Sequence, residues 1–500
     1  MPLSAAISRH AVERPDFPAF RLEDRVFSYR ELAGDAARLL ACFRHLCGDK
    51  EGRSRIGPAH RLVAISTGNH ALFAAAFVAA TSAGHCAALI DPSQPEAVRA
   101  RMIAALRPDL LVTAEGDGLS IADPYDATAE TFHSQPPEGI AALPEGEASA
   151  PFMIVFTSGT TADPKPIIRD RRSWRVSLQA GAPLFDIDGE SSTLSPGPLA
   201  HGLALYAMTE TLLAGAQFAA AGRFDPVSAL ETIRRHSLSR LVLVPTMLRR
   251  LADAAGGGTF GAVRAITVAG AKLTAADRAL AARVFPHAAL REYYGASELG
   301  FVSVTAPGDP ASPTAVGRAF PGLSISILNE AGMPLPAGET GTIHVDSPLI
   351  SDGYVTGGDG SGFRRRGRLA TVGDLGFLET DGTLHLLGRA GGMVLSGGNN
   401  VYPSEIEAVL STLAPIRSAY VFGLDHPDLG QELAAVLEPA QAGLTAEALA
   451  SALSGALPRY KHPRRIWLCR TMPATGSGKV AAKVLRQWIA DGNDALERLS

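Results

Sequence analysis

Apolar strand-like runs alternate with helical stretches rich in alanine and leucine over most of this chain. The run at 62–66, LVAIS, precedes a helical pattern over 70–84, and FMIVFT at 152–157 leads into a polar loop. Over 229–245 a helical pattern precedes another strand-like run, RLVLVP. Such alternation is typical of a largely parallel sheet covered by helices. The sequence therefore predicts an α/β fold for its larger part.

The pattern changes after about residue 311. Short alternating runs with glycine and proline turns follow, and Asp381-Gly382 between two of them predicts a β-hairpin. A glycine-rich stretch at 388–398 then precedes a region of mixed pattern. Five hundred residues exceed what one hydrophobic core holds. We predict an N-terminal domain over 1–390, with α/β layers and a small β unit, and a small mobile α+β domain over 391–500.

Composition and charge exclude several classes of protein. The hydrophobic fraction of 46% and the charged fraction of 19% indicate a globular chain. The net charge of −4 gives no reason to expect binding of a nucleic acid. The three arginines at 364–366 are interpreted as a solvated loop. The cysteines fit no zinc-site spacing, so we expect reduced thiols at Cys42, Cys47, Cys86 and Cys469.

One apolar stretch, Leu72–Ile90, is about as long as a membrane span. It is rich in alanine and interrupted by polar residues and Gly84, so a helix, a glycine and a strand are favoured. The N-terminus carries charges where a signal peptide would be apolar. The sequence predicts a cytoplasmic monomer or homodimer without an integral membrane segment.

The loop at 157–166, TSGTTADPKP, offers groups that suit an anion. Gly159 lets backbone N–H groups approach closely, the hydroxyls beside it add donors, and Lys165 adds a mobile charge. A P-loop would place its lysine at the start of a helix, whereas Lys165 lies between Pro164 and Pro166. Taken alone, the loop is either a phosphate-binding loop or an ordinary polar turn.

Later segments carry groups that would complete a nucleotide site. YYGASELG at 293–300 places aromatic residues and a glycine, which can cover a base, before Glu298, an oxygen ligand of the kind that Mg²⁺ favours. Asp374 lies among glycines in TVGDLGF, and Arg389 follows fifteen residues later. Lys479 lies in the glycine-rich PATGSGKV. Each group alone fits a turn or a solvated charge, but the ordered set favours a nucleotide site.

These motifs together resemble those of the adenylate-forming superfamily of acyl-CoA synthetases, peptide-synthetase adenylation domains and firefly luciferase. The resemblance covers essentially the whole chain, from RPDFPAF through PGPLAHG and GGMVLSGGNNVYPSEIE to PATGSGKV, and is closest to the acyl-CoA synthetases. It implies that a carboxylic acid is activated by ATP as an acyl-adenylate and then transferred to the thiol of CoA. The implied cofactors are ATP, Mg²⁺ and CoA.

The resemblance also implies roles for individual residues. The residues with catalytic roles are Thr161, Lys165, His201, Glu298 and Lys479. The residues that contact ATP are Thr157, Ser158, Gly159, Thr160, Thr161, Lys165, Gly270, Ala271, Tyr294, Gly295, Ser297, Asp374, Arg389 and Lys479. The loop and Lys165 would hold the β- and γ-phosphates, and Lys479 would reach the α-phosphate and the carboxylate.

Within this set, Tyr294 would stack on adenine, Asp374 and Arg389 would hold the ribose, and Thr161 and Glu298 would bind Mg²⁺. The acid pocket would be lined by His201, Gly202, Ala269, Gly270 and Ala296. Pantetheine would pass near Ser396, Gly397 and Gly398. The small domain would rotate between the two steps about a hinge at Gly391.

Five positions depart from the usual pattern of the family. Ala162 and Pro166 replace glycines and stiffen the phosphate loop, while Ser297 replaces a threonine and keeps its hydroxyl. Gly391 stands where the hinge usually has a charged residue, and Ala482 where an arginine often follows the lysine. None of these changes removes a group that performs the chemistry.

The expected acid pocket is apolar or small apart from His201. It has no acidic group to meet an ammonium and no arginine to meet a second carboxylate, so a monocarboxylic acid with an aliphatic or aromatic body is expected, as in fatty acid metabolism. Two alternatives remain open. The chain would load an acyl group onto the phosphopantetheine of a carrier protein, or it would bind acyl nucleotides without catalysis.

Overall fold

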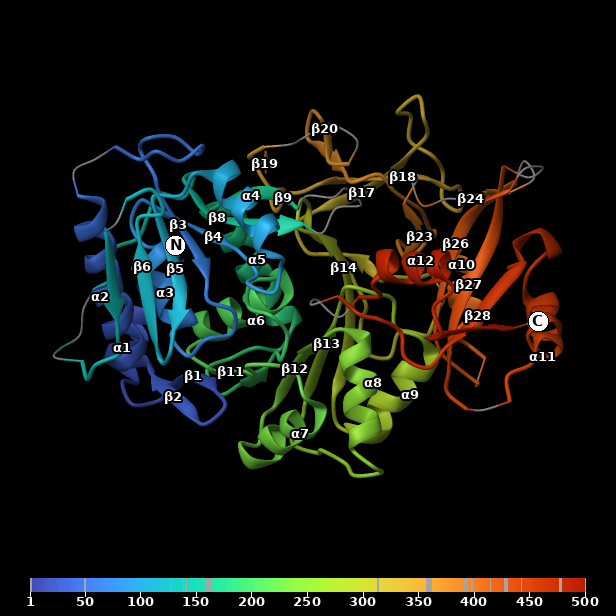
Figure 1. Cartoon of the computed structure of the whole chain (residues 1–500), viewed down its shortest axis with the longest axis horizontal. Helices are drawn as coiled ribbons and strands as arrows, with labels where there is room; N and C mark the ends of the chain where they lie inside the picture. The colour runs from blue at the N-terminus through green and yellow to red at the C-terminus, as the bar shows by residue number, and fades with distance from the viewer. Residues whose placement is uncertain are drawn as a thin grey trace.

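The computed structural model describes the chain in fifteen stretches. They are residues 2–48, 51–126, 128–137, 139, 142–157, 164–312, 314–356, 362–389, 392, 394–396, 399–413, 415–426, 430–441, 443–475 and 479–499. Within these residues there are four sheets, three in an N-terminal body and one in a smaller C-terminal domain (Figure 1). The predicted fold class, an α/β body with a small β unit followed by an α+β domain, is confirmed.

The first sheet has eight strands in the order β19-β9-β8-β4-β3-β5-β6-β7. Its parallel centre comprises β3 (Arg61–Ser66), β4 (His85–Leu89), β5 (Leu110–Glu115) and β8 (Pro151–Thr157). Its antiparallel outer strands are β6 (Gly118–Ala122), β7 (Ala129–Phe132), β9 (Lys165–Asp170) and β19 (Gly353–Tyr354). The apolar stretch before β4 forms α3 (Phe73–Thr81) and Gly84, as predicted.

The second sheet has nine strands in the order β16-β15-β14-β13-β12-β10-β11-β1-β2. Its parallel strands are β1 (Pro18–Leu22), β10 (Ser192–Leu194), β11 (Gln217–Ala220), β12 (Arg240–Leu243), β13 (Ala265–Val268) and β14 (Ala289–Ala296). Antiparallel strands close its ends, namely β2 (Arg25–Ser28), β15 (Gly300–Val304) and β16 (Arg318–Ala319). The N-terminal strands therefore complete a sheet built mostly by residues 192–319.

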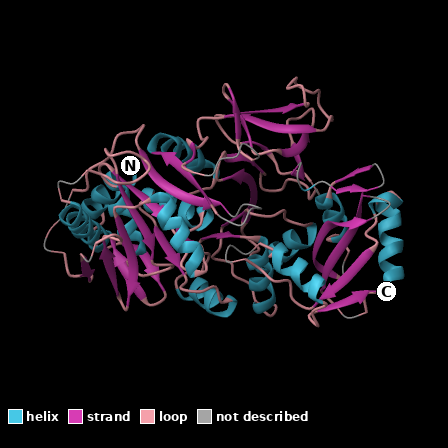
Figure 2. Ribbon diagram, turned by 45° about the horizontal axis from the view of Figure 1, so that its top comes forward, coloured by secondary structure: helices cyan, strands magenta, loops and turns pink. Residues whose placement is uncertain are grey.

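Helices fill the space beside and between these sheets (Figure 2). They are α1 (Pro2–Glu13), α2 (Tyr29–Cys47), α4 (Glu96–Leu106), α5 (Arg171–Leu184), α6 (Gly202–Leu213), α7 (Pro226–Arg235), α8 (Pro245–Ala254) and α9 (Ala275–Val284). A capping box of Ser28 and Glu31 starts α2. Every residue of α3 is buried, which fits a helix that is apolar on all sides. The main core joins α3 and α6 to both sheets.

The β unit is antiparallel, as predicted. It contains β17 (Ser324–Leu328), β18 (Gly341–Asp346), β20 (Arg364–Arg366), β21 (Leu369–Thr371), β22 (Asp374–Leu378) and β23 (Leu384–Arg389). The hairpin at Asp381-Gly382 is confirmed, since β22 pairs with β23 and Gly382 has a φ of 84°. The expectation of a loop at 364–366 was wrong, because these residues form β20, which pairs with β21. The three arginines are exposed, and an edge strand also tolerates charge on both faces.

The C-terminal domain is a sheet with three α-helices and one short 3-10 helix, Arg459–Lys461, in the described residues. Its strands are β24 (Val394–Ser396), β25 (Asn399–Val401), β26 (Ile416–His426), β27 (Gly430–Pro439), β28 (Arg465–Cys469) and β29 (Leu496–Leu499). Its helices are α10 (Pro403–Leu410), α11 (Ala446–Ala456) and α12 (Ala482–Asp491). The boundary expected after residue 390 falls where residues 390 and 391 lie outside the described ones, so its position stays a prediction.

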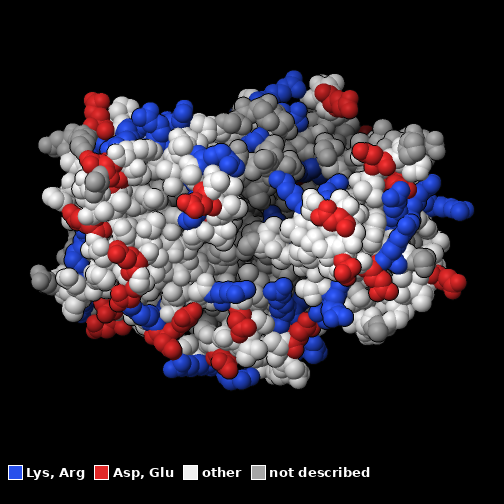
Figure 3. All heavy atoms as spheres, viewed as in Figure 1, with Lys and Arg blue, Asp and Glu red and all other residues white. Residues whose placement is uncertain are grey.

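The chemistry of the cysteines and of the surface follows from this packing. All four cysteines are free thiols, and burial raises the pKa of Cys47 to about 11. On the face drawn in Figure 3, acidic and basic side chains are interspersed over both domains. Within the described stretches, no helix has both the length and the apolar character needed to cross a bilayer.

A buried ion pair between α6 and β12 offers a test of the body's stability. Arg240 Nη2 lies 2.5 Å from Glu210 Oε1, and both residues are buried. We expect Arg240→Met to lower the free energy of unfolding by about 3–5 kcal/mol, because it strands the Glu210 carboxylate in the core. Urea unfolding of the single variant and of the double variant Arg240→Met/Glu210→Leu measures this. The double variant should recover most of the loss, and equal losses would contradict the explanation.

Candidate active site

The predicted phosphate loop joins the ends of two adjacent strands. The backbones of Thr157 and Lys165 pair across β8 and β9, so the loop closes as a hairpin at its base. Lys165 begins a strand rather than a helix, which confirms that the loop is not a P-loop. Its Nζ lies 5.7 Å from the centre of the Tyr354 ring. Ser158, Gly159, Thr160 and Thr161 lie outside the described residues, as does the side chain of Thr157.

Glu298 lies between β14 and β15, where its side chain is buried. The hydroxyl of Tyr354 donates a hydrogen bond to Glu298 Oε1 at 2.8 Å. The Ser351 N–H donates to the Glu298 carbonyl at 2.8 Å. The backbone and the carboxylate of Glu298 are therefore both held by the segment around β19. Tyr354 was not singled out from the sequence.

Arg169 links the strand after the phosphate loop to the segment that carries Glu298. It lies on β9 and is almost fully buried. Its guanidinium donates to the Ser297 carbonyl at 2.6 Å and to the Leu349 carbonyl at 2.7 Å. Burial lowers the pKa of Arg169 to about 10, so it stays charged at neutral pH. This buried arginine was also missed from the sequence.

Tyr294, Asp374 and Arg389 meet at the ends of three strands. The Tyr294 hydroxyl donates to Asp374 Oδ2 at 2.5 Å, and Arg389 Nε donates to Asp374 Oδ1 at 3.1 Å. The hairpin of β22 and β23 creates the second contact, because it pairs Asp374 with Arg389. Burial, and then the Asp374 charge, raises the pKa of Tyr294 well above its usual value. The structure thus brings together three residues that the sequence placed in a nucleotide site.

A glycine in the strand of Tyr294 permits a close approach of backbone. A Cβ added at Gly295 would lie 2.4 Å from the Gly300 carbonyl oxygen, so no side chain fits there. Ala296 ends the same strand and is half-buried. Figure 1 shows β14 near the centre of the molecule, on the side of α12. The aromatic–glycine motif therefore borders the junction of the two domains.

Lys479 reaches this junction from the C-terminal domain. A Cβ added at Gly270 would lie 3.6 Å from Lys479 Cε, and Gly270 itself has a φ of 89°. The Thr475 N–H donates to the Lys479 carbonyl at 2.7 Å and closes the loop that carries the lysine. Lys479 is exposed to solvent. Desolvation by the surrounding protein, and then the Arg389 charge, lower the pKa of its ammonium, and the charges of Asp374 and Glu298 offset only part of this effect. Lys479 therefore lies within electrostatic reach of these three residues.

His201 directly precedes α6 and is paired with a carboxylate. Its Nε2 lies 2.8 Å from Asp91 Oδ2. Burial raises the pKa of Asp91, but hydrogen bonds from His201 and Ser93 outweigh it and lower the value to about 2. Asn69 holds the segment before His201, since its side chain accepts from the Leu199 N–H at 2.7 Å. The sequence had suggested neither Asp91 nor Asn69.

Small residues converge beside His201, where the acid pocket was expected. A Cβ added at Gly197 would lie 3.8 Å from both Ala204 Cβ and Met247 Cε. One added at Gly270 would lie 3.4 Å from Val244 Cγ1. The segments at 197–204, 244–247 and 269–271 therefore lie together, and their contacts here are apolar. Gly202, Ala269 and Ala271 belong to these segments or border them.

Of the residues expected to guide CoA, only Ser396 lies within the described residues, and it lies apart from the other site residues. Ser396 ends β24 in the C-terminal sheet, where its backbone pairs with Gly430, and not at the strand ends that gather the other residues. Gly397 and Gly398 lie outside the described residues, as does the hinge residue Gly391.

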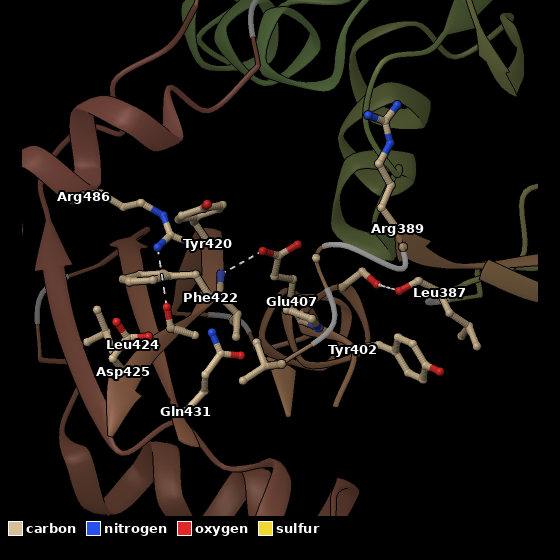
Figure 4. A pocket seen from close by; sticks show the side chains of 17 residues that line it. Leu387, Arg389, Tyr402, Glu407, Tyr420, Phe422, Leu424, Asp425, Gln431 and Arg486 are labelled. Carbon is tan, nitrogen blue, oxygen red and sulfur yellow. Dashed lines mark hydrogen bonds between the residues drawn. The ribbon is translucent and has the colours of Figure 1, made fainter. Parts of the chain in front are cut away.

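A cavity of about 450 Å³ lies between the end of β23 and the C-terminal domain (Figure 4). Leu387, Gly388 and Arg389 line its body side, with the Arg389 guanidinium pointing away from the other lining side chains. Glu407 accepts a hydrogen bond from the Val421 N–H at 2.7 Å, and burial raises its pKa to about 7. The cavity is therefore formed mostly by the C-terminal domain, beside the stretch that carries the expected hinge.

A dedicated metal site gathers several ligating side chains in one place. Within them, no three His, Cys, Asp or Glu side chains gather as such a site requires. Mg²⁺ in nucleotide sites is bound by one or two carboxylates together with phosphates of the substrate. Glu298 fits that pattern, because the hydrogen bond from Tyr354 uses Oε1 and leaves Oε2 for a cation.

Comparisons with known proteins show the family to which the chain belongs. The sequence model described as AMP-binding enzyme matches residues 7–355, and that described as AMP-binding enzyme C-terminal domain matches residues 405–479. The uncharacterized acyl-CoA ligase YhfT of Bacillus subtilis is 32% identical over 433 residues, 86% of this chain and 88% of the relative. The medium/long-chain-fatty-acid–CoA ligase FadD8 of Mycobacterium tuberculosis is 27% identical over 429 residues, 82% of this chain and 74% of that protein.

The fold also matches a solved structure over almost its whole length. ATP-bound MatB from Rhodopseudomonas palustris superposes with a TM-score of 0.81, at 24% identity, over 98% of this chain and all of that chain. This likeness concerns the fold alone. The two family matches span more than half of the chain, and together with YhfT they support the class predicted from the motifs. The chain therefore belongs to the family of AMP-binding enzymes and is an AMP-forming acid–thiol ligase of the acyl-CoA ligase class.

Proposed function

We propose that this enzyme activates a monocarboxylic acid with an apolar body and transfers the acyl group to CoA, with the residues assigned below. One observation carries the assignment. Lys479, from the C-terminal domain, lies beside Gly270 and within reach of the charges of Glu298, Asp374 and Arg389 in the body. A lysine placed there can face the reacting phosphate when the neighbouring groups hold the nucleotide.

In the first step a carboxylate oxygen bonds to the α-phosphorus of ATP, and pyrophosphate leaves with the electrons of the broken P–O bond. Both reactants are anions, so the chain must supply positive charge where negative charge develops. Lys165 would face the β- and γ-phosphates, and Lys479 the α-phosphate and the carboxylate. Asp374 and Arg389 would hold the ribose hydroxyls, and the ring of Tyr294 would cover adenine.

Mg²⁺ would be held by Glu298 and by Thr161 of the phosphate loop. Glu298 is suited to this role because it is buried and oriented by Tyr354. When bound, the cation neutralises phosphate charge and supports departure of pyrophosphate. Ser297 would lie beside the same phosphates, with its carbonyl already fixed by Arg169.

In the second step the sulfur of CoA attacks the acyl carbonyl carbon, its thiol proton passes to solvent, and AMP leaves with the electrons of the broken C–O bond. The small domain would first rotate about Gly391, which removes Lys479 and brings Ser396, Gly397 and Gly398 toward the thiol's path. The acid would lie beside His201 and the small residues around Gly197 and Gly270.

The substrate class rests on the apolar contacts around Gly197 and Gly270. The name of FadD8 favours an aliphatic acid. The test is pyrophosphate release across saturated fatty acids of increasing length, aromatic acids, dicarboxylic acids and amino acids, with and without CoA. We expect release with monocarboxylic acids only, and thioester with CoA. Thioester formed only on a phosphopantetheinylated carrier protein would assign the other acceptor.

The compartment of the protein is proposed from its thiols. All four cysteines are unpaired, and three of them are buried. Unpaired cysteines are typical of proteins in a reducing environment. We therefore place the enzyme in the cytoplasm.

The role of Glu298 can be tested by changing its charge and little else. Glu298→Gln keeps the shape of the side chain and a partner for the Tyr354 hydroxyl. The rate of adenylation should fall, and the Mg²⁺ concentration for half-maximal rate should rise by about 10- to 100-fold, the loss expected for a charge-assisted contact of about 1.5–3 kcal/mol. ATP–pyrophosphate exchange at graded Mg²⁺ measures this. An unchanged Mg²⁺ dependence would leave Glu298 only a structural role.

A further inference from the structure

The side chain of Tyr354 connects two parts of the proposed site. It lies on β19, a strand of two residues that pairs with β9 through Gly353–Ile168 and Tyr354–Ile167. Its hydroxyl donates to Glu298 Oε1 at 2.8 Å, and its ring centre lies 5.7 Å from Lys165 Nζ. One aromatic side chain thus contacts the proposed metal carboxylate at its tip and the proposed phosphate lysine at its ring.

The backbone around Tyr354 keeps this arrangement in register. β9 begins at Lys165, so the lysine and Tyr354 lie on neighbouring strands of one sheet edge. Farther along β9, Arg169 donates to the carbonyl of Ser297, the residue before Glu298. The Ser351 N–H donates to the carbonyl of Glu298 itself. The main chain at Glu298 is therefore fixed by other residues, and Tyr354 acts on its carboxylate.

Orientation of that carboxylate matters for a cation. A glutamate has several rotatable bonds, and a ligating carboxylate is commonly held by a hydrogen bond from a second group. The Tyr354 hydroxyl is such a donor, and it engages one oxygen only. Burial and the Glu298 charge both raise the pKa of Tyr354, so the phenol keeps its proton at neutral pH. A cation over the ring face is also favourable.

We propose that Tyr354 is a positioning residue for the adenylation step: it orients the Glu298 carboxylate toward the cation of the bound nucleotide and holds Lys165 beside it. This inference rests on the proposed function and adds a residue that the motifs do not contain. The hydroxyl and the ring of Tyr354 have different roles in this proposal, because the hydroxyl acts through Glu298 and the ring through Lys165.

The test compares ATP binding to the full-length protein with Mg²⁺ and with EDTA, by calorimetry. Tyr354→Phe removes the hydroxyl and keeps the ring. We expect its ATP affinity with Mg²⁺ to fall by about tenfold, the lower end of the loss when a partner of a metal ligand is removed, with no change in EDTA. Tyr29→Phe is the matched control, since Tyr29 is buried and its hydroxyl donates to the Ala216 carbonyl away from the site. The control should bind ATP like the parent in both conditions.

A double variant shows whether Tyr354 acts through Glu298. With Glu298→Gln already present, adding Tyr354→Phe should cause little further loss of Mg²⁺-dependent affinity, because groups that act as a unit are not additive. Full additivity would overturn the proposal, and so would a Tyr354→Phe variant that binds Mg²⁺ and ATP like the parent.

The same data separate this inference from the proposed function. A parent protein that binds no ATP would overturn the proposed function and this inference with it. A parent with Mg²⁺-dependent binding that Tyr354→Phe leaves unchanged would overturn the inference alone. An equal loss with Mg²⁺ and with EDTA would also overturn it, because a general structural defect does not depend on the cation.

Discussion

Replacing Lys479 with alanine should lower the rate of adenylation by about 10²–10³-fold, the range seen when one preorganised donor to a developing oxyanion is lost. Lys479 is the cation that the C-terminal domain brings to Gly270, and its neighbours include the charges of Asp374 and Glu298. Attack of CoA on a supplied acyl-adenylate should proceed at close to the parent rate, because the proposed rotation carries Lys479 away before that step. ATP–pyrophosphate exchange and thioester formation from synthetic adenylate measure the two steps separately.

A neighbouring lysine provides the control for this prediction. Lys483 is exposed in the first turn of α12, four residues beyond Lys479, so Lys483→Ala removes the same charge outside the site. It should leave both half-reactions near the parent rates. If Lys479→Ala lowered the two half-reactions equally, the proposed role in adenylation alone would be wrong.

The second large effect is expected at the hinge. Glycine at 391 can adopt φ values that other residues avoid, whereas proline would hold φ near −65°. If the rotation passes through this residue, Gly391→Pro should retain one half-reaction at near-parent rate and reduce the other severely. Measuring each half-reaction separately shows which orientation is trapped.

Two milder substitutions separate hinge bending from general damage. Gly391→Ala should slow the affected step less than proline does, since alanine loses only part of the accessible φ range. Gly392→Ala is the positional control, because nothing lies within 4 Å of the Cβ that it would add. A proline variant that runs both steps like the parent would move the pivot to another residue.

The fold class could be predicted because each element carries its own pattern. The alternation of helical and strand-like runs and the Asp381-Gly382 turn are local signals, and the structure confirms both. The order of strands could not be predicted in the same way. β1 lies beside β11, with Phe20 opposite Phe218, because of packing between distant segments that no local pattern records. The three arginines of β20 show that a local pattern can also mislead. Their charge indicated that they are exposed, but not that they form a strand that pairs with β21.

Some residues of the site can likewise be found from the sequence, and others cannot. Asp374, Arg389 and Lys479 could be found because each lies in a distinctive glycine-rich segment. Arg169 and Tyr354 could not, because their contacts join residues that are far apart in the chain. Arg169 meets Ser297 across 128 residues, and Tyr354 meets Glu298 across 56. Nothing in the sequence around Arg169, PIIRDRR, indicates that its side chain donates to two carbonyls far along the chain.

The pairing of β1 with β11 has a consequence for the order of events during synthesis. During synthesis β1 emerges almost two hundred residues before its parallel partner β11, at Gln217–Ala220. Until that segment emerges, the edge of β1 that will face β11 is unpaired, and the apolar side chains of Phe20 and Phe27 lack part of their cover. Exposed edges of this kind invite association between nascent chains. β1 and β2 must therefore wait for a distant segment before they gain their native contacts, and a chaperone that covers them during synthesis would limit such association.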